Sequence, residues 1–183
     1  MNNYIVLMLL FINVVGVFPK KASSYITRLG QVTFFSHTDV ENIEAVNNQT
    51  LCVLDIETGD IVLHILMKAF VFENELMREH FNESYIESDL YPKATFRGKI
   101  VDFNPTESDT QVRMIEGQFT LKDKTAPLAF KVKIDNTNDG YTMSGNAEVF
   151  IDDYTIKIPK LLSPNIAKSL DVSFNFEFIM DEQ

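Results

Sequence analysis

The chain has 183 residues, of which 45% are hydrophobic and 15 are phenylalanine, and it has no tryptophan. This length predicts a single domain with a substantial core. The formal net charge of -10 excludes nucleic acid as an expected partner, because nucleic-acid binding needs a basic surface.

The N-terminal segment predicts export. Residues 4–18 are uncharged and strongly apolar, and a proline, two lysines and several small residues follow. About fifteen apolar residues are short for a membrane span and typical of the apolar region of a signal peptide. We therefore expect residues 1–24 to be a signal peptide, cleaved between Gly16 and Tyr25. The mature protein would then be periplasmic or secreted and have no stable membrane span; an uncleaved anchor is the alternative.

From residue 25 onward, alternating apolar and polar residues predict strands almost throughout. Residues 32–37 and 51–56 are the first two, with a turn at residues 46–48. Gly59 then provides the positive φ that a tight hairpin turn needs. Residues 61–72 predict one long strand that is apolar on both faces, so one face would fill an interior and the other would lie under a helix.

A short helix is predicted between Asn74 and Tyr85. Met77, Phe81 and Tyr85 recur at every fourth residue, which places them in one row on a helix. Asn74 is suited to cap its N-terminus. A short helix between long strands, with a methionine and aromatic row facing them, predicts a lid over a sheet.

The strand pattern resumes after this helix. Further strands are expected at residues 93–103, 111–121, 129–134, 141–150 and 171–178. About eight strands with only short helices predict an all-β fold, a closed antiparallel barrel of a size that can hold one small ligand. No internal repeat or linker is present, so residues 25–183 are interpreted as one domain.

The residues around the predicted helix carry a pattern in which methionine, aromatic and small polar residues recur at fixed spacing. Its members are Met67, Phe70, Phe72, Leu76, Met77, His80, Phe81, Asn82, Tyr85, Ser88, Tyr91, Pro92, Ala94, Phe96 and Gly98. This pattern resembles the YceI-like family. An early run from Phe34 to Glu44 and a late one at residues 153–160 resemble the same family, whereas Lys122-Asp123 replaces the family's His-Gly pair.

The resemblance implies a lipocalin-like barrel that is exported and holds a long isoprenoid or fatty chain. The candidates for lining its cavity are inward-facing apolar residues of the strands and the helix row. They are Phe34, Leu63, Ile65, Met67, Met77, Phe81, Tyr85, Phe96, Ile100, Phe119, Phe174 and Phe176. Without the resemblance, a solid core is the simpler interpretation; with it, a cavity is favoured. Gly98 and Gly117 face inward and would leave room for a ligand.

Other chemistry is mostly absent from the sequence. His37, His64 and His80 have no metal-type spacing to one another or to Cys52, so no metal site is expected. Cys52 is interpreted as a small buried hydrophobe, and His64 and His80 as structural histidines that hydrogen-bond. No nucleophile turn or phosphate-binding glycine loop occurs. We expect no catalytic residue and no cofactor.

Three functions follow from these patterns. The first is an exported carrier whose partner is an apolar or amphiphilic small molecule with an isoprenoid or fatty-acyl chain. The second is an enzyme that uses the same cavity, which would need a converging acid, base or nucleophile. The third is a structural or protein-interaction barrel with a filled core and no enzymatic activity. The oligomeric state stays open, with a homodimer among the options.

Overall fold

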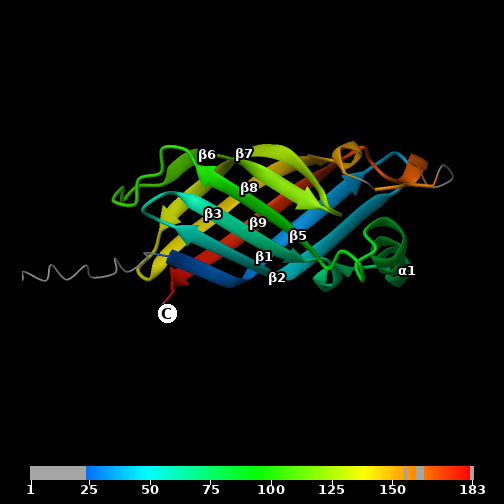
Figure 1. Ribbon diagram of the computed structural model, residues 1–183, viewed down its shortest axis with the longest axis horizontal. Coiled ribbons are helices and arrows are strands. Elements are labelled where there is room, and N and C mark those ends of the chain that lie inside the picture. Colours follow the sequence, from blue (N-terminus) through cyan, green and yellow to red (C-terminus); the bar gives the residue numbers. More distant parts are fainter. Residues whose placement is uncertain (1–23, 155, 160–162, 182–183) are drawn as a thin grey trace, which may run out of the picture.

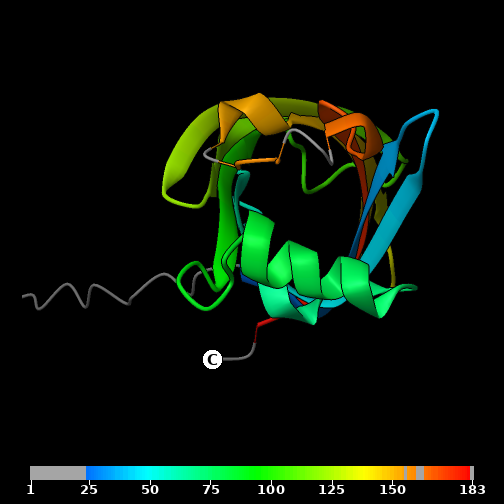
Figure 2. The same cartoon turned by 90° about the vertical axis from the view of Figure 1, so that its right-hand side faces the viewer.

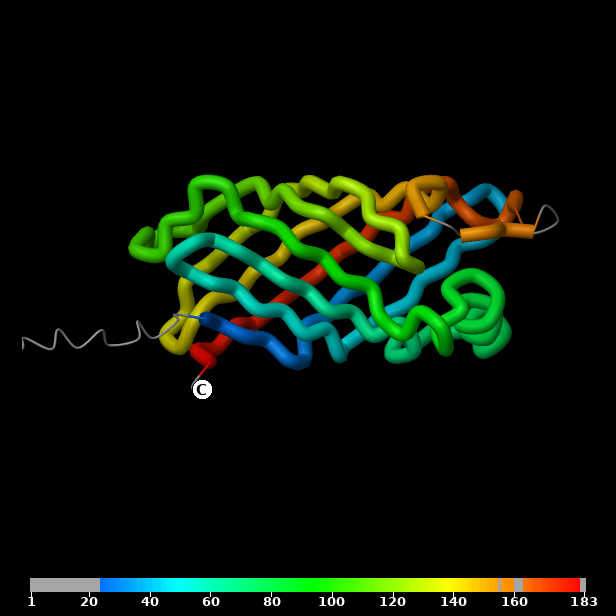
Figure 3. The backbone as a smooth tube through the Cα atoms, in the orientation of Figure 1, coloured from blue at the N-terminus to red at the C-terminus, as the bar shows by residue number. Residues whose placement is uncertain are grey.

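The protein is a closed antiparallel β-barrel of eight long strands, as the sequence predicted (Figures 1 and 3). The structure, a computed structural model, describes residues 24–154, 156–159 and 163–181. The barrel strands are β1 (Ser24–His37), β2 (Asn42–Asp55), β3 (Asp60–Leu66), β5 (Lys93–Ile100), β6 (Gln111–Leu121), β7 (Lys124–Asn136), β8 (Gly140–Phe150) and β9 (Ser169–Met180). Pairing of β1 with both β2 and β9 closes the barrel. The expected signal peptide lies outside the described residues, except for Ser24.

Strand alternation places the core as predicted. On β9, Phe176 and Phe178 are buried inside the barrel while Asn175 and Glu177 beside them are exposed. Successive side chains of a strand point to opposite faces, so each strand contributes every second side chain to the interior. Gly59 has φ of 76° in the β2–β3 turn, the left-handed backbone that the hairpin required.

The turn predicted at residues 46–48 is wrong, because β2 runs through it. Asn47 is fully buried; its amide nitrogen donates to the Leu66 carbonyl at 2.8 Å and its side-chain oxygen accepts from the Gln49 amide at 2.7 Å. The pairing with β1 shifts register at this point, between Gly30 and Val32. The asparagines therefore mark an irregularity inside a long strand and not its end.

The single strand predicted over residues 61–72 is also wrong. Strand β3 ends at Leu66, a 3-10 turn spans Met67–Ala69, and the two-residue strand β4 (Val71–Phe72) pairs with β2. Met67 and Phe70 both point inward, with 4% and 5% of their surface exposed. The apolar run on both faces thus arises from a helical turn between two strands, because residues three apart on such a turn share a face.

The predicted lid is present at one end of the barrel (Figure 2). Helix α1 (Glu75–His80) continues into a π-helical turn, Phe81–Tyr85, and we call residues 75–85 the lid. The Asn74 side chain caps α1 by accepting from the Leu76 amide at 2.9 Å, which confirms the predicted cap. Just beyond the lid, the Ser88 amide donates to the Asn82 carbonyl at 2.8 Å.

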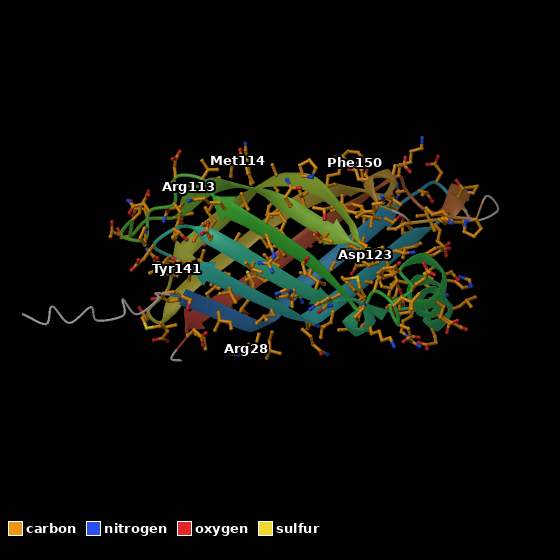
Figure 4. All side chains as sticks on the ribbon, in the orientation of Figure 1. Arg28, Arg113, Met114, Asp123, Tyr141 and Phe150 are labelled. Carbon is orange, nitrogen blue, oxygen red and sulfur yellow. The ribbon has the colours of Figure 1, made fainter. Side chains whose placement is uncertain are left out.

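The far end of the barrel is solid. Tyr141 packs edge-on against Tyr25 with ring centroids 5.0 Å apart, and Phe103 covers it at 6.0 Å. Figure 4 places Tyr141 at this end, remote from the lid. Gln111 is buried there and holds the loop before β6, since its side chain bonds both the amide and the carbonyl of Asn104. Side chains therefore close the interior at this end.

The barrel wall is less continuous at the lid end. Strands β7 and β8 pair only from Val132–Gly145 to Asn136–Tyr141, although β7 pairs along its length with β6 and β8 along its length with β9. Residues 124–131 and 146–150 therefore form two strand edges without pairing to each other, which we call the seam. Beyond β8 the chain folds back as a 3-10 turn, Ile151–Asp153, and buries Tyr154 against Phe119.

Candidate functional site

A cavity of about 380 Å³ lies in the barrel under the lid and reaches inward to Ile61, Ile115 and Met143. It is bounded at the end by the lid, the β1–β2 hairpin and the segment that follows β8. Figure 2 shows these three elements at the same end of the barrel. Pockets for small molecules run from about 300 to 1,000 Å³ and are mostly apolar. Apart from five polar residues, its described lining is aliphatic, aromatic or thioether side chains.

Eleven of the twelve residues predicted to line a cavity do surround it. They are Phe34, Leu63, Ile65, Met67, Met77, Phe81, Tyr85, Phe96, Phe119, Phe174 and Phe176. Ile100 is the exception: it is buried, with 1% exposed, and is not among the lining residues, although its cross-strand partner Ile115 is. Alternation places Ile100 on the inward face of β5, but it does not tell whether an inward side chain reaches the cavity or is covered by its neighbours. That the eleven residues contact a ligand stays a prediction.

The lid is anchored to the wall by a cluster of phenylalanines. The ring centroid of Phe81 lies 5.6 Å from that of Phe34 on β1. It lies 5.7 Å from the ring of Phe70, which precedes β4, and 5.1 Å from the ring of Phe72 on β4. Aromatic pairs at such separations are favourable beyond the area they bury. The cluster closes one side of the cavity, and it depends on the turn at Met67–Ala69, which brings Phe70 inward.

A second aromatic chain lines the cavity from β5 to β9. Phe96 on β5, Phe130 on β7, Phe174 and Phe176 on β9 follow one another with ring centroids 5.2 to 5.5 Å apart. Met143 on β8 is fully buried and lines the cavity with them. Rings and a thioether present smooth, polarizable surface that adapts to a flexible hydrocarbon chain.

The expectation that Gly98 and Gly117 leave room for a ligand is wrong. These two glycines face each other across β5 and β6, and the Phe96 ring lies over both. A Cβ on Gly117 would lie 2.4 Å from the Arg97 carbonyl oxygen and 2.6 Å from the Phe96 ring. The missing side chains therefore allow the aromatic wall to lie close to the backbone, and the space is already filled.

Polar side chains gather at the mouth of the cavity. The five polar lining residues are Ser36, Glu41, Asn74, His80 and Asn165, and the Tyr85 ring lies with them. Asn165 Nδ2 donates to Glu41 Oε2 at 3.0 Å, which ties the segment after β8 to the β1–β2 turn. Burial raises the pKa of the Tyr85 hydroxyl, and the negative charge of Glu41 raises it further. The mouth is therefore a polar ring over an apolar interior.

Sequence reasoning missed most of this ring. Glu41, His80 and Asn165 come from three segments far apart in the chain, so no local motif connects them. His80 was expected to hydrogen-bond as a structural residue, yet it lines the mouth and its ring has no hydrogen-bond partner within the described residues. The only early signal was its place in the pattern around the lid.

Lys122 fixes the C-terminal end of the lid. Its ammonium group donates to the Tyr85 carbonyl at 2.8 Å and to the Glu87 carboxylate, and it lies 5.6 Å from the centre of the Tyr91 ring. Lys122 is in the β6–β7 turn beside Asp123, near the lid in Figure 4. Lys122 is 8% exposed, and its ammonium group is satisfied by these contacts.

The remaining candidate groups show no shared chemistry. Cys52 is fully buried, as predicted, and burial raises the pKa of its thiol. The expected hydrogen bond of His64 is absent: its Nδ1 is buried without a partner in the described structure. Burial lowers the pKa of His64, and the charges of Lys93 and Arg97 lower it further. Within the described residues no three histidine, cysteine or carboxylate side chains are grouped to hold a metal ion.

Comparison with known proteins points to one family. The YceI-like domain matches residues 21–178 of the chain. A polyisoprenoid-binding domain from Saccharophagus degradans, implicated in plant cell wall breakdown, superposes with a TM-score of 0.74 at 11% identity, over 87% of this chain and 99% of that one. BcnA of Burkholderia cenocepacia superposes with a TM-score of 0.68 at 14% identity, over 83% of this chain and 96% of that one. The YceI protein of Campylobacter jejuni gives 0.53 at 12% identity over both full chains. No curated protein matches the sequence.

Proposed function

This chain belongs to the YceI-like family, and on that premise we propose that it is a carrier that binds a long-chain apolar or amphiphilic ligand in the barrel. The ligand is of isoprenoid or fatty-acyl type. The observation that carries the proposal is the cavity of about 380 Å³, whose interior is apolar and whose mouth is polar. An amphiphile matches this arrangement, with its tail inside and its head at the mouth.

The energetics support a long tail. Each methylene group moved from water into an apolar site contributes about 0.8 kcal/mol. A tail of about ten buried carbons would thus gain about 8 kcal/mol, from which the cost of ordering the chain and of association is subtracted. The relative from Saccharophagus degradans, described as polyisoprenoid-binding, favours the isoprenoid over the fatty-acyl class.

We propose binding without catalysis. The residues at the mouth do not form a nucleophile with an adjacent base: Glu41 accepts from Asn165, and His80 has no side-chain partner within the described residues. Nucleophilic and general-base catalysis both need such groups within hydrogen-bond reach of one another. A carrier needs none of them.

Lipid extraction of protein purified from its own host tests the proposal. Native mass spectrometry should show a bound species, and the extract should contain a stoichiometric isoprenoid or acyl compound. The same extraction from the variant Val172→Trp, whose indole would fill the cavity, controls for lipid that is bound to the outer surface of the barrel. Protein that is free of ligand, and that binds no isoprenoid or fatty probe after purification, would overturn the proposal.

We also propose that the protein is exported after cleavage of residues 1–24, which act as the signal peptide. Support comes from the apolar run at residues 4–18 and from the first strand, which begins at Ser24, so that a cut beside it leaves the barrel whole. N-terminal sequencing should start between Gly16 and Tyr25. Soluble cytoplasmic protein that begins at Met1 would contradict export. Among the helices of the described residues, none has the length and apolarity to cross a membrane.

A further inference from the structure

The charge at the mouth of the cavity is one-sided. Of the described lining residues, Glu41 is the one carboxylate, and no lysine or arginine is among them. The elements around the opening add further acids. The β1–β2 turn carries Asp39, and residues 75–85 hold three glutamates against one arginine. The segment after β8 carries Asp152 and Asp153 as well as the exposed Lys157 and Lys168, which do not line the cavity.

Glu41 is held in place for contact with a ligand. Its backbone is fixed by Thr38, whose Oγ1 accepts from the Glu41 amide and donates to the Glu41 carbonyl, both at 3.0 Å. Asn165 Nδ2 donates to one carboxylate oxygen, Oε2. The other oxygen, Oε1, has no donor within the described part of the chain, so it is an acceptor that a ligand can use.

The cations nearest the lid are already paired. Arg78 donates from Nε to Glu75 at 2.8 Å in a two-pronged contact on α1. Lys122 is bound to Glu87 and to the Tyr85 carbonyl. An anionic head at the mouth would therefore lie next to Glu41, with no lysine or arginine among the described lining residues to neutralise it. Like charges repel strongly where the surroundings are partly desolvated.

We infer that the cavity selects ligands whose head group donates a hydrogen bond to Glu41, an alcohol or an amine, and disfavours anionic heads such as carboxylates and phosphates. Tyr85 and His80 line the same mouth and can accept or donate a second bond to such a head. This inference rests on the proposed function, because it assigns a head-group class to the ligand that the cavity holds.

Probes that share one tail test the inference. Hexadecanol, hexadecylamine and hexadecanoate compete for the cavity of lipid-stripped protein against a neutral fluorescent probe at about pH 8, where the fatty acid is ionised. We expect the alcohol and the amine to bind at least about tenfold more tightly than the carboxylate, because only the carboxylate is repelled by Glu41. Equal affinities, or tightest binding of the carboxylate, would overturn the inference.

The variant Glu41→Gln separates charge from shape. It keeps the side-chain size and removes the charge, so hexadecanoate should gain affinity about tenfold while hexadecanol changes little. Glu44→Gln is the matched control, since Glu44 is exposed on β2 and does not line the cavity. Unchanged hexadecanoate binding in Glu41→Gln would overturn the inference. Failure of all three probes to bind would instead overturn the proposed function itself.

Discussion

Phe34 in the barrel wall and Phe81 in the lid stack on each other, with ring centroids 5.6 Å apart and planes inclined by 25°. One ring belongs to a long strand, the other to the first residue of the π-helical turn. The pair therefore joins the barrel wall to the element that covers the cavity. The same contact packs the lid against the wall and bounds the cavity.

Replacing Phe81 by alanine should affect both properties. Phe81 is half-buried, so we expect a loss in the free energy of unfolding near about 3 kcal/mol, the lower end for a phenylalanine truncation. Affinity for an apolar probe should fall as well, after correction for the folded fraction. Urea unfolding and probe titration measure the two effects. The control is Phe150→Ala, at a half-exposed site on β8. If Phe81→Ala leaves the affinity for the probe unchanged, the lid contributes to packing only.

A matched pair of valine substitutions tests whether the cavity is the binding site. Val172 on β9 lines the cavity, whereas Val112 on β6 is 61% exposed and does not line it. Val172→Trp should abolish probe binding, because the indole takes the space of the ligand tail, while Val112→Trp should leave it intact. Thermal unfolding should confirm that both variants fold. Normal binding by a folded Val172→Trp protein would place the ligand elsewhere.

Loss of the Lys122 ammonium group should loosen the lid. In Lys122→Met the Tyr85 carbonyl and the Glu87 carboxylate lose their donor, which should cost about 1–3 kcal/mol. Hydrogen exchange should speed up at residues 75–88 and stay unchanged in β8 and β9. Lys124→Met serves as the control, because Lys124 lies in the same hairpin but is exposed. Exchange that rises equally in all strands would show general destabilisation instead of a local effect.

Tyr154 makes stability depend on pH at the alkaline end. Burial raises its pKa to about 12, with a further contribution from Asp153, whereas a tyrosine in the unfolded chain has a pKa near about 10. Between these two pKa values the unfolded state loses the proton first, so stability falls as the pH rises, at most by about 1.4 kcal/mol per pH unit. Urea unfolding at about pH 8 and about pH 11 should show a smaller fall in Tyr154→Phe. An identical fall in both proteins would contradict this role.

Strand alternation was sufficient to predict the barrel and most residues around its cavity. Phe174 and Phe176 face inward because a period of two fixes the face of each side chain. The same period does not tell which inward side chains reach the cavity surface: Ile100 is not among the lining residues, although its cross-strand partner Ile115 is. The continuous apolar run at residues 61–72 also hid the turn at Met67–Ala69, because an apolar run does not distinguish a strand from a helical turn.

The polar mouth could not be predicted for a different reason. Glu41 and Asn165 are 124 positions apart and meet only because the barrel closes. A glycine likewise has two opposite meanings in a strand. Gly117 was expected to leave empty space, but the Phe96 ring fills that space, and only the three-dimensional contact distinguishes the two cases.

The seam between β7 and β8 has a consequence for the width of the hydrocarbon chain that the proposed cavity could accommodate. Near the lid, β6 pairs with β7 and β8 pairs with β9 along their lengths, but residues 124–131 of β7 do not pair with residues 146–150 of β8. The wall of the barrel is therefore not closed by backbone hydrogen bonds between these two hairpins. Its circumference can increase by parting the two hairpins at the cost of side-chain packing around Tyr154, without breaking a ladder hydrogen bond between them. We therefore expect a bulky, methyl-branched chain to be accommodated by a small separation of the two hairpins, with the ladder hydrogen bonds within each hairpin kept.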